Sequence, residues 1–383
     1  MKRSQFLTFI SIFLSVHLLV NFYIGLRGWQ ALERFPELRP FFLGIFVLVV
    51  FSYLIGEILE RKAPSFLSDI LVWIGAFWFA FMLYFLLALV VLDLGRIMQY
   101  FFHILPSQSP EDYLQIKLDL GIGVVTAITL IIIRGYYNAM HIRVKHLTID
   151  IDKTSDVDSL NIVALSDMHL GTIIGKKRLQ VMVDQINALK PDLVLMPGDQ
   201  VDGNPGPVIH KRLGEYFRKI KAPMGIFAIT GNHEYIGDVE RSCAYLESSG
   251  ITMLRDASVE IKGVQIVGRE DHSFKQFSGK ERKTIDEVMH GIDRSKPIIL
   301  LDHQPFHLEE AEQAGVDLQL SGHTHHAQLW PLNYLTQKIY EVSWGFKKRG
   351  NTNYYVSCGV GTWGPPTRIG SYSEIVQISL KFK

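Results

Sequence analysis

Five short polar signatures in the second half of the chain combine aspartate, histidine and asparagine, which are side chains that bind transition metals. A stretch of β-type residues precedes each signature, so every signature lies where an apolar run ends. Because the ligand crevice of an open α/β sheet lies beyond the carboxyl ends of its strands, we expect the signatures to converge on one crevice. They are Asp167-Met-His169, Gly198-Asp199-Gln-Val-Asp202, Gly231-Asn232-His233-Glu234, His303-Gln304-Pro305 and Gly322-His323-Thr-His325.

The donor types predict which ions the crevice would hold. Aspartate and asparagine oxygens together with histidine nitrogens suit manganese, iron, zinc or cobalt better than calcium or an all-oxygen magnesium cage. These side chains exceed what one ion needs, and with one carboxylate shared they would fill most of two coordination shells. Two divalent or trivalent ions about 3.5 to 4 Å apart are the arrangement that acts on a phosphoryl group. Asp199 is the natural bridge, because its carboxylate would screen the repulsion between the cations.

The strands that must position these signatures alternate with a helical pattern. Apolar residues recur at three- and four-residue spacing from Leu179 to Leu189, and Lys190-Pro191 ends this predicted helix before the next strand. A mixed sheet, or a pair of packed sheets with flanking helices, fits this order. Strands are predicted at 161–165, 193–196, 225–229, 298–301 and 318–320, with antiparallel strands at 259–261, 264–267, 354–358 and 375–382.

The chain before about Met140 is of a different kind, with long apolar runs and few charges. A helix needs about 20 largely apolar residues to span the hydrocarbon core of a bilayer. The fourth candidate span carries Asp119 and Arg134 near its ends, so a buried helix of the soluble domain is the alternative there. We predict a multi-pass transmembrane anchor at 1–140 and a soluble α/β domain at 141–383. The candidate spans are 6–26, 41–58, 70–92 and 118–137.

The lysines and arginines of the loops predict the orientation in a cell membrane. With four spans, a modest bias in these residues places both termini and the soluble domain in the cytoplasm. With three spans, the N-terminus and the domain would lie on opposite sides. The first segment could also be an uncleaved signal, but it lacks a small-residue cleavage site and other spans follow it, so we interpret it as an anchor. The basic residues on the N-terminal side are Lys2, Arg3, Arg61, Lys62, Arg134, Arg143 and Lys145, against Arg27, Arg34, Arg39, Arg96 and Lys117.

Composition argues against several other classes of protein. A formal net charge of +1 and a pI near 7.8 show no basic excess, so no nucleic-acid partner is expected. Cys243 and Cys358 form neither a disulfide framework nor a cysteine-based zinc site. His17 is the only mid-span ionisable residue of the first segment, and no series of such residues indicates a proton or ion path. Transport is therefore not expected.

The order of the signatures resembles the calcineurin-like metallophosphoesterase superfamily. Within it, Gly322-His-Thr-His, Trp330-Pro331 and the tail Gly359-Val-Gly-Thr-Trp-Gly-Pro-Pro366 are similar to the membrane-anchored bacterial phosphoesterases. The resemblance covers roughly His141 to the C-terminus. It implies a fold of two facing mixed sheets with helices outside, which an all-α bundle of about four transmembrane helices precedes.

The resemblance also implies a role for each matching residue. One metal ion would be bound by Asp167, His169 and His325, and the other by Asn232, His303 and His323, with Asp199 bridging the two. His233 matches the family's catalytic histidine, near the phosphoryl oxygens or the leaving group, and Asp202 matches the carboxylate that orients it.

A few residues outside the shared pattern are interpreted separately. His326 stands where the family usually has a small residue, and we interpret it as part of the rim of the substrate opening. We assign His307, Asp271 and Glu270 to the surface or the substrate rim. The segment from Trp330 to Arg368 is rich in aromatic and basic residues, which fits either a membrane-facing rim for an amphiphilic substrate or ordinary packing of sheet and loops.

These observations predict a membrane-tethered hydrolase that cleaves phosphodiester or pyrophosphate-type bonds with a hydroxide that two metal ions bridge. We expect the substrate to be a phosphoester. If the rim faces the membrane, this substrate would be amphiphilic or lipid-linked. A phosphomonoesterase is the alternative among enzymes, and a non-catalytic metal-binding membrane receptor or regulator is the alternative outside them. The presence of His233 argues against the latter, because a binding module would not need it. The oligomeric state is left open.

Overall fold

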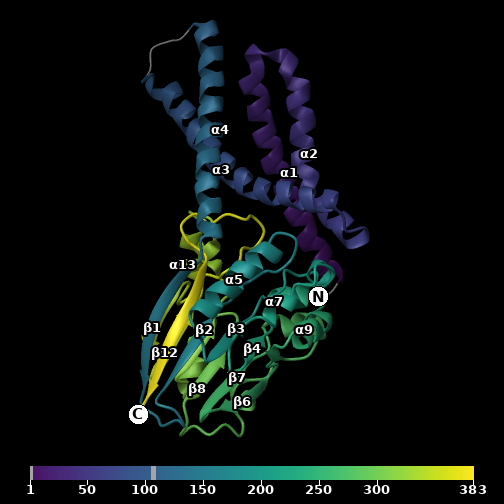
Figure 1. Cartoon of the computed structure of the whole chain (residues 1–383). Helices are drawn as coiled ribbons and strands as arrows, with labels where there is room; N and C mark the ends of the chain where they lie inside the picture. Colours follow the sequence, from purple (N-terminus) through teal and green to yellow (C-terminus); the bar gives the residue numbers. More distant parts are fainter. Residues whose placement is uncertain (1–2, 105–108) are drawn as a thin grey trace. The chain divides into compact units, whose positions relative to one another are not determined.

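The computed structural model describes residues 3–104 and 109–383. The chain forms two compact units, Met1–Gly135 and Tyr136–Lys383. Figure 1 shows long helices in the first unit and two sheets with flanking helices in the second.

The N-terminal unit consists of four long helices. Each is long and apolar enough to cross a membrane, which confirms the four predicted spans as apolar helices. Only 11% of the most apolar window of the fourth helix is buried, so its interpretation as a buried helix of the soluble domain is wrong. The helices are α1 (Arg3–Ala31), α2 (Arg39–Lys62), α3 (Phe66–Phe102) and α4 (Pro110–Met140), with the short 3-10 helices η1 (Leu32–Arg34) and η2 (Pro36–Leu38).

Helix α3 is longer than its predicted apolar segment, because capping sets its ends. The Ser65 side chain accepts a hydrogen bond from the Ser68 backbone N–H, and the Ser68 hydroxyl accepts one from the Ser65 N–H, which forms a capping box. The helix ends at His103, whose φ of 49° is left-handed. The additional turns carry Asp93 and Arg96.

The C-terminal unit contains two six-stranded mixed sheets, as the resemblance implies. The strand order is β1-β12-β2-β3-β4-β5 in one sheet and β10-β11-β9-β8-β7-β6 in the other. Strands β11 and β12, expected to be antiparallel, each have one antiparallel and one parallel neighbour. The strands of the first sheet are β1 (Arg143–Ile151), β2 (Ser159–Ala164), β3 (Leu193–Pro197), β4 (Ile226–Ile229), β5 (Thr252–Met253) and β12 (Glu374–Phe382); those of the second are β6 (Ala257–Ile261), β7 (Val264–Gly268), β8 (Ile298–Leu301), β9 (Leu318–Ser321), β10 (Gly345–Arg349) and β11 (Thr352–Val356).

Three apolar layers hold the C-terminal unit together. Leu195 of the first sheet and Ile299 of the second belong to one buried cluster between the sheets. The neighbouring Val194 and Met196 belong instead to a cluster that includes the residues of α5, because successive side chains of a strand point to opposite faces. A third cluster joins β8 and β11 to α11 and α12. The helices are α5 (Lys176–Ala188), α6 (Gly206–His210), α7 (Gly214–Phe217), α8 (Asn232–Ile236), α9 (Val239–Ser248), α10 (Ser273–Ser278), α11 (Ile285–Val288), α12 (Leu308–Gln313), α13 (Asn333–Ile339) and the 3-10 helix η3 (His325–Ala327).

The last turn of α4, from Tyr136 on, is part of the C-terminal unit. Arg178 donates hydrogen bonds to the carbonyls of Ala139 and Met140, and the Ser373 hydroxyl donates to the Ala139 carbonyl over 2.8 Å. These donors satisfy carbonyls that the end of a helix leaves without a partner. Within this unit, the last turn of α4 is therefore bonded to α5 and to the residue that precedes β12.

Candidate metal centre and active site

The five polar signatures lie at the carboxyl ends of strands in both sheets. Asp167 and His169 follow β2, and Asp199 follows β3. The remaining three signatures follow β4, β8 and β9. The parallel neighbours β2, β3 and β4 end at one edge of the first sheet, and β8 and β9 end at one edge of the second. The sheet order therefore brings together signatures that are far apart in the sequence.

One group of three ligand atoms comes from Asp167, His169 and His325. These atoms lie within 4.8 Å of one another, and all three residues are buried. The Nε2 atoms of the two histidines are 2.9 Å apart, and the Nε2 of His325 is 3.4 Å from Oδ1 of Asp167. Two imidazole nitrogens that face each other beside a carboxylate form a donor set that a cation fits.

A second group contains Asp199, His303 and His323, with Asn232 beside it. The first three offer ligand atoms within 4.8 Å of one another. Nε2 of His303 is 3.1 Å from Oδ2 of Asp199, and Nδ1 of His323 is 2.7 Å from Oδ1 of Asn232. Asp199 Oδ2 is also 3.8 Å from Nε2 of His169, which belongs to the first group. Asp199 thus lies between the two groups.

The tautomer of His303 follows from its surroundings. Its Nδ1 lies 2.7 Å from the carbonyl of Pro197, so Nδ1 carries the proton and donates it. The opposite nitrogen, Nε2, is buried and has no well-directed hydrogen bond among the described residues, although Oδ2 of Asp199 lies 3.1 Å from it. A ring whose Nδ1 donates to a carbonyl presents the lone pair of Nε2, as metal-binding histidines do. His303 therefore fits a metal ion.

Five of the residues in the two groups have an unusual backbone conformation. A left-handed φ is uncommon outside glycine and concentrates at functional sites, where the surrounding structure holds the strain. Here the amide of Asp167 donates to the carbonyl of Gly198, and the amide of His323 donates to the Asp167 carboxylate over 2.9 Å. The values are Asp167 54°, His169 48°, Asp199 55°, His323 69° and His325 47°.

Two glycines of the signatures leave space for these side chains. A Cβ on Gly322 would collide with the side chains of Ser166 and Asp167. A Cβ on Gly198, whose φ is 94°, would collide with the His303 ring. Each glycine is therefore required by the close approach of a site residue.

His233 and Asp202 lie directly beside the two groups. Nδ1 of His233 is 3.0 Å from Oδ1 of Asp202, and the His233 amide donates to Oδ1 of Asp199 over 2.9 Å. Burial alone would lower the pKa of His233, but the charges of Asp199 and Asp202 raise it to about 9. The protonated form of the His233 ring is thus favoured.

Asp202 contacts two histidines. Its Oδ1 lies 3.3 Å from Nδ1 of His169 as well as close to His233. Burial would raise the pKa of this carboxyl, but hydrogen bonds from His169 and His233 hold it well below its usual value. The contact with His169, a member of the first group, was not expected from the sequence.

Comparison with known proteins agrees with this geometry. The family model of the calcineurin-like phosphoesterases matches residues 160–327. An uncharacterized metallophosphoesterase of Aquifex aeolicus is 35% identical over 245 residues, which cover 63% of this chain and 93% of the relative. The chain belongs to the calcineurin-like metallophosphoesterases. A relative from Helicobacter pylori J99 is also named an uncharacterized metallophosphoesterase. It is 33% identical over 268 residues, which cover 69% of this chain and 71% of the relative.

The similarity of this phosphoesterase to its relatives also extends into the N-terminal unit. A protein of Danio rerio named transmembrane protein with metallophosphoesterase domain is 31% identical over 409 residues, which cover 99% of this chain and 90% of the relative. Together with the four apolar helices, this similarity supports association of the phosphoesterase with a membrane.

Glu234 is a site residue of the phosphoesterase to which the sequence assigned no role. It is fully buried, and its carboxylate accepts hydrogen bonds from the backbone amides of Asp199, Val201 and Gly231. Burial, with the nearby charge of Asp199, raises its pKa to about 7. Glu234 therefore holds the loop that presents Asp199. Its position in the Gly231-Asn232-His233-Glu234 signature is the sequence feature that could have indicated a role in the site.

Arg368 lies inside the phosphoesterase domain, so of the two interpretations of its segment, ordinary packing applies to this residue. It is 0% exposed and donates to the carbonyls of Gly359 and Gly361. Its Nη2 also lies 3.3 Å from Nδ1 of His325. The guanidinium supports the loop behind the first ligand group, which only the packing of distant segments reveals.

The assignment of Glu270 and Asp271 to the surface or the rim is wrong. Both are buried. Glu270 accepts hydrogen bonds from the hydroxyls of Thr230 and Tyr235, and Asp271 accepts one from the Gln304 amide. They hold together the loops that carry the signatures. His307, by contrast, is exposed.

His326 does not face the substrate opening as expected. It is buried, its Nδ1 lies 3.0 Å from the Ser343 hydroxyl, and its ring packs against Trp344 at 5.3 Å between centroids. It borders a separate pocket that Trp344 and Tyr340 also line.

A cavity of about 370 Å³ opens onto the ligand groups. Asp199, Asn232, His233, His323 and His325 line one part of it. The other lining residues are apolar or uncharged: Thr324, Ala327, Gln328, Leu332, Thr336 and Trp363. The ring of Trp363 lies 6.1 Å from that of His233. A phosphoester could thus contact both the ligand groups and apolar or uncharged side chains in this cavity.

Proposed function

We propose that this chain is a membrane-anchored, metal-dependent hydrolase that cleaves phosphodiester or pyrophosphate-type bonds at a centre of two metal ions. The observation that carries the proposal is the pair of ligand groups with Asp199 between them and the His233–Asp202 pair at their side. Family membership supports the coarser part, hydrolysis of a phosphoester with a metal ion.

The proposed ligand sets follow the two groups. Asp167, His169 and His325 would hold one ion, Asn232, His303 and His323 the other, with Asp199 shared. The donor set of oxygen and imidazole suits manganese, iron, zinc or cobalt. When bound, two such ions supply Lewis-acid chemistry that lowers the pKa of a water molecule and neutralises charge on the phosphoryl oxygens.

His233 is the proposed proton donor to the leaving oxygen. Its raised pKa, about 9, keeps the ring protonated near neutral pH, and Asp202 holds Nδ1 so that Nε2 is the nitrogen free to donate. Proton transfer from a positioned side chain contributes about a hundredfold or more to a rate. The same pair argues against a non-catalytic receptor, because ion binding alone does not need it.

The cavity favours a diester over a monoester as substrate. The described residues that line it include no lysine or arginine, which a dianionic monoester would favour. Leu332 and Trp363 offer an apolar contact for the second ester group of a diester. A higher kcat/KM for an aryl monophosphate than for a bis-aryl phosphate would favour the phosphomonoesterase alternative.

The rim of the cavity supports an amphiphilic substrate. Helix α13 has no buried residue, and Tyr334, Leu335 and Ile339 are all more than half exposed. In the same unit, Asn138 near the end of α4 donates to the carbonyl of Arg368, at the end of the aromatic segment. An exposed apolar helix in a segment bonded to the end of a membrane helix fits a surface at the level of lipid headgroups.

We further propose a multi-pass cell-membrane protein with its C-terminal domain in the cytoplasm. The four apolar helices and the excess of lysine and arginine on the N-terminal side support this topology. Protease treatment of oriented vesicles tests it: cleavage of the C-terminal half only after the cytoplasmic face is opened is expected, and cleavage from the opposite face would contradict it.

The decisive experiment measures metal content and hydrolysis of bis-aryl phosphate on the detergent-purified chain. We expect metal-dependent turnover that falls about a hundredfold in His233→Ala with the bound metal retained. His307→Ala serves as a matched control, because His307 is exposed. Metal loss in His233→Ala as large as in Asp199→Ala would contradict the role of His233, and no turnover with any of the four metals would favour the receptor alternative.

A further inference from the structure

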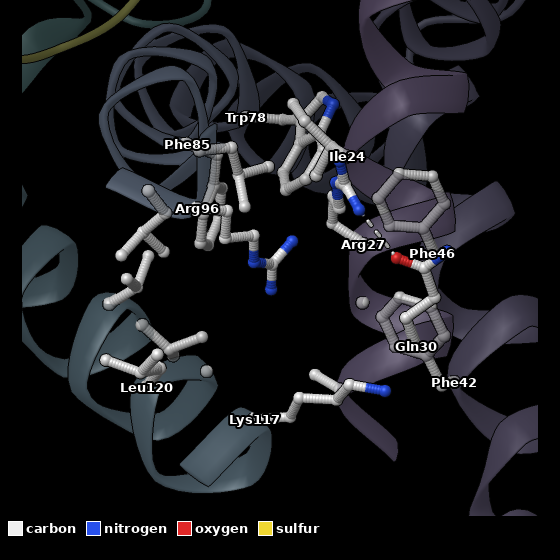
Figure 2. A pocket seen from close by; sticks show the side chains of 17 residues that line it. Ile24, Arg27, Gln30, Phe42, Phe46, Trp78, Phe85, Arg96, Lys117 and Leu120 are labelled. Atoms are coloured by element: carbon white, nitrogen blue, oxygen red, sulfur yellow. Dashed lines mark hydrogen bonds between the residues drawn. The ribbon is translucent and has the colours of Figure 1, made fainter. Parts of the chain in front are cut away.

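A cavity of about 220 Å³ lies among the four helices of the N-terminal unit (Figure 2). Its lining combines an aromatic wall, Phe42, Phe46, Trp78 and Phe85, with a cation group, Arg27, Arg96 and Lys117. Figure 2 shows the guanidinium of Arg96 reaching into the middle of the cavity. A cavity lined by aromatic rings and by cations is complementary to an amphiphile with an anionic headgroup.

The cavity exists because α4 stands apart from the other helices. Helices α1, α2 and α3 pack closely, whereas α4 contacts them only sparsely. Two close approaches of α4 are known at the rim: Nζ of Lys117 is 2.6 Å from Oε2 of Glu33, and a Cβ on Gly121 would be 3.2 Å from that of Ala31. Unfilled space between apolar side chains forfeits dispersion contacts, so hydrocarbon that enters the gap is stabilising.

The cation group carries a surplus of positive charge. Asp93 accepts hydrogen bonds from both Arg27 (2.5 Å) and Arg96 (3.0 Å), and Glu33 pairs with Lys117, so three cations face two carboxylates. The hydroxyl of Tyr23 donates to the carboxylate of Asp93. Moreover, Nε of Arg27 is buried without a hydrogen-bond partner among the described residues. A buried donor without an acceptor is costly, and a phosphate oxygen would supply both the acceptor and the missing negative charge.

The sequence positions of the cation group match the depth of lipid headgroups. Arg27 lies near the end of α1, Arg96 near the end of α3 and Lys117 near the start of α4. Trp29 and Tyr100 lie at the same helix ends, where aromatic residues mark the boundary between membrane and water. Lysine and arginine at this depth attract anionic lipids.

We infer that this cavity binds an anionic phospholipid, with the phosphate at the cation group and an acyl chain along the aromatic wall. The volume of about 220 Å³ is below the range of about 300 to 1,000 Å³ of ordinary small-molecule sites. It therefore accommodates the headgroup and the first part of one chain, and the rest of the lipid lies in the bilayer. The site is separate from the metal centre and does not depend on the proposed hydrolysis.

Native mass spectrometry of the detergent-purified full-length chain tests this site. Phosphatidylglycerol and phosphatidylcholine with the same chains are titrated, and inorganic phosphate is added as a competitor. We expect phosphatidylglycerol to bind about fivefold or more tightly, the effect of about one unbalanced cation. Equal binding of the two lipids would overturn the inference. Displacement by an equal concentration of inorganic phosphate would show a site for free phosphate and would also overturn it.

Variants localise the binding to the cavity. Arg96→Gln should weaken phosphatidylglycerol about fivefold and weaken phosphatidylcholine, whose phosphate is balanced by its own choline cation, by less. Val124→Phe, which fills the apolar part, should weaken both lipids. The matched control is Arg61→Gln. Arg61 lies in the last turn of α2, at the other end of the helix from the cavity-lining Phe42, and its side chain is 65% exposed. If Arg61→Gln lost as much affinity for phosphatidylglycerol as Arg96→Gln, the proposal would be wrong. Should a variant fail to fold, the comparison of the two lipids on the unaltered chain still decides the question.

Discussion

The two units of the molecule expose and bury the same residue types in opposite ways. Phe22 and Phe41 on the N-terminal helices are 70% and 72% exposed, whereas Ile299 and Leu320 in the sheets are 0% and 1% exposed. Apolar surface in water costs about 25 cal/mol per Å². The exposed faces of α1 and α2 are thus compatible with hydrocarbon and not with water, while the sheets bury their own apolar surface.

Charged groups show the reverse contrast. In the C-terminal unit Asp167, Asp199 and His303 are almost completely buried. The free-energy cost of burying these charges is offset when opposite charges or bound ions lie next to them. In the N-terminal unit Arg27 and Arg96 remain partly exposed near helix ends. These charged groups are thus buried at strand ends in the C-terminal unit and partly exposed near helix ends in the N-terminal unit.

The largest expected effect concerns the buried charge that the two ligand groups share. Asp199→Ala should reduce turnover about a thousandfold, because both ions lose a ligand and the electrostatic stabilisation of the reacting phosphate goes with them. Metal analysis beside the turnover assay checks this. Asp152→Ala, at a carboxylate whose side chain is 80% exposed, is the control. Full metal content in Asp199→Ala would break the assignment of a shared carboxylate.

The second prediction tests the contrast in exposure directly, with one substitution in each unit. Leu130→Arg, on an exposed face of α4, should disfavour membrane insertion by about 3 kcal/mol. Val181→Arg, on an exposed face of α5, should change the free energy of unfolding by less than about 0.5 kcal/mol. Membrane fractionation measures the first and chemical denaturation the second. Equal fractionation of Leu130→Arg and the unaltered chain would argue against α4 as a span.

A smaller effect is expected at the carboxylate beside the ligand groups. Asp202→Asn keeps the shape but removes the charge that both His169 and His233 contact, so turnover should fall about ten- to a hundredfold. Metal titration separates the two contacts. Weaker metal affinity points to the contact with His169, whereas lower turnover at full metal loading points to His233. Unchanged turnover and affinity would show that neither contact matters.

The smallest effect concerns the exposed apolar helix beside the cavity. Leu335→Ser on α13 should lower the preference for a phospholipid-like diester over a soluble aryl diester about fivefold, because part of one apolar side chain no longer contacts the lipid. Turnover of the soluble substrate should not change. If the unaltered protein shows no preference between the two substrates, the interpretation of α13 as a membrane-facing rim is wrong.

Much of the fold followed from local patterns. The five strands before the signatures were predicted to within two residues of their observed bounds, because each is a short apolar run that ends at a polar signature. Strand β1 was missed, since only Ile149 and Ile151 are buried along it and the rest gives no regular alternation. It forms because β12 pairs with it along its whole length, which is a tertiary interaction.

The candidate site, like the fold, was predicted only in part from the sequence. The residue types and their order predicted which side chains gather, but not that Asp202 contacts two histidines or that Arg368 is buried beside His325. These contacts join segments more than 30 and 40 residues apart in the chain. Such distances carry no periodic signal, so residue types alone left both interpretations open for the segment that contains Arg368.

The amino-acid sequence by itself determined the division into apolar helices and an α/β domain, and it determined the set of side chains able to bind metal ions. These properties depend on residue type and on spacing over a few positions, which set hydropathy, strand ends and donor chemistry. Only the tertiary structure decided that Asp202 contacts two histidines, that Glu270 is inside, and that α4 leaves a cavity with unbalanced charge. Those facts depend on how sheets and helices pack, because packing alone brings distant side chains within a few ångströms.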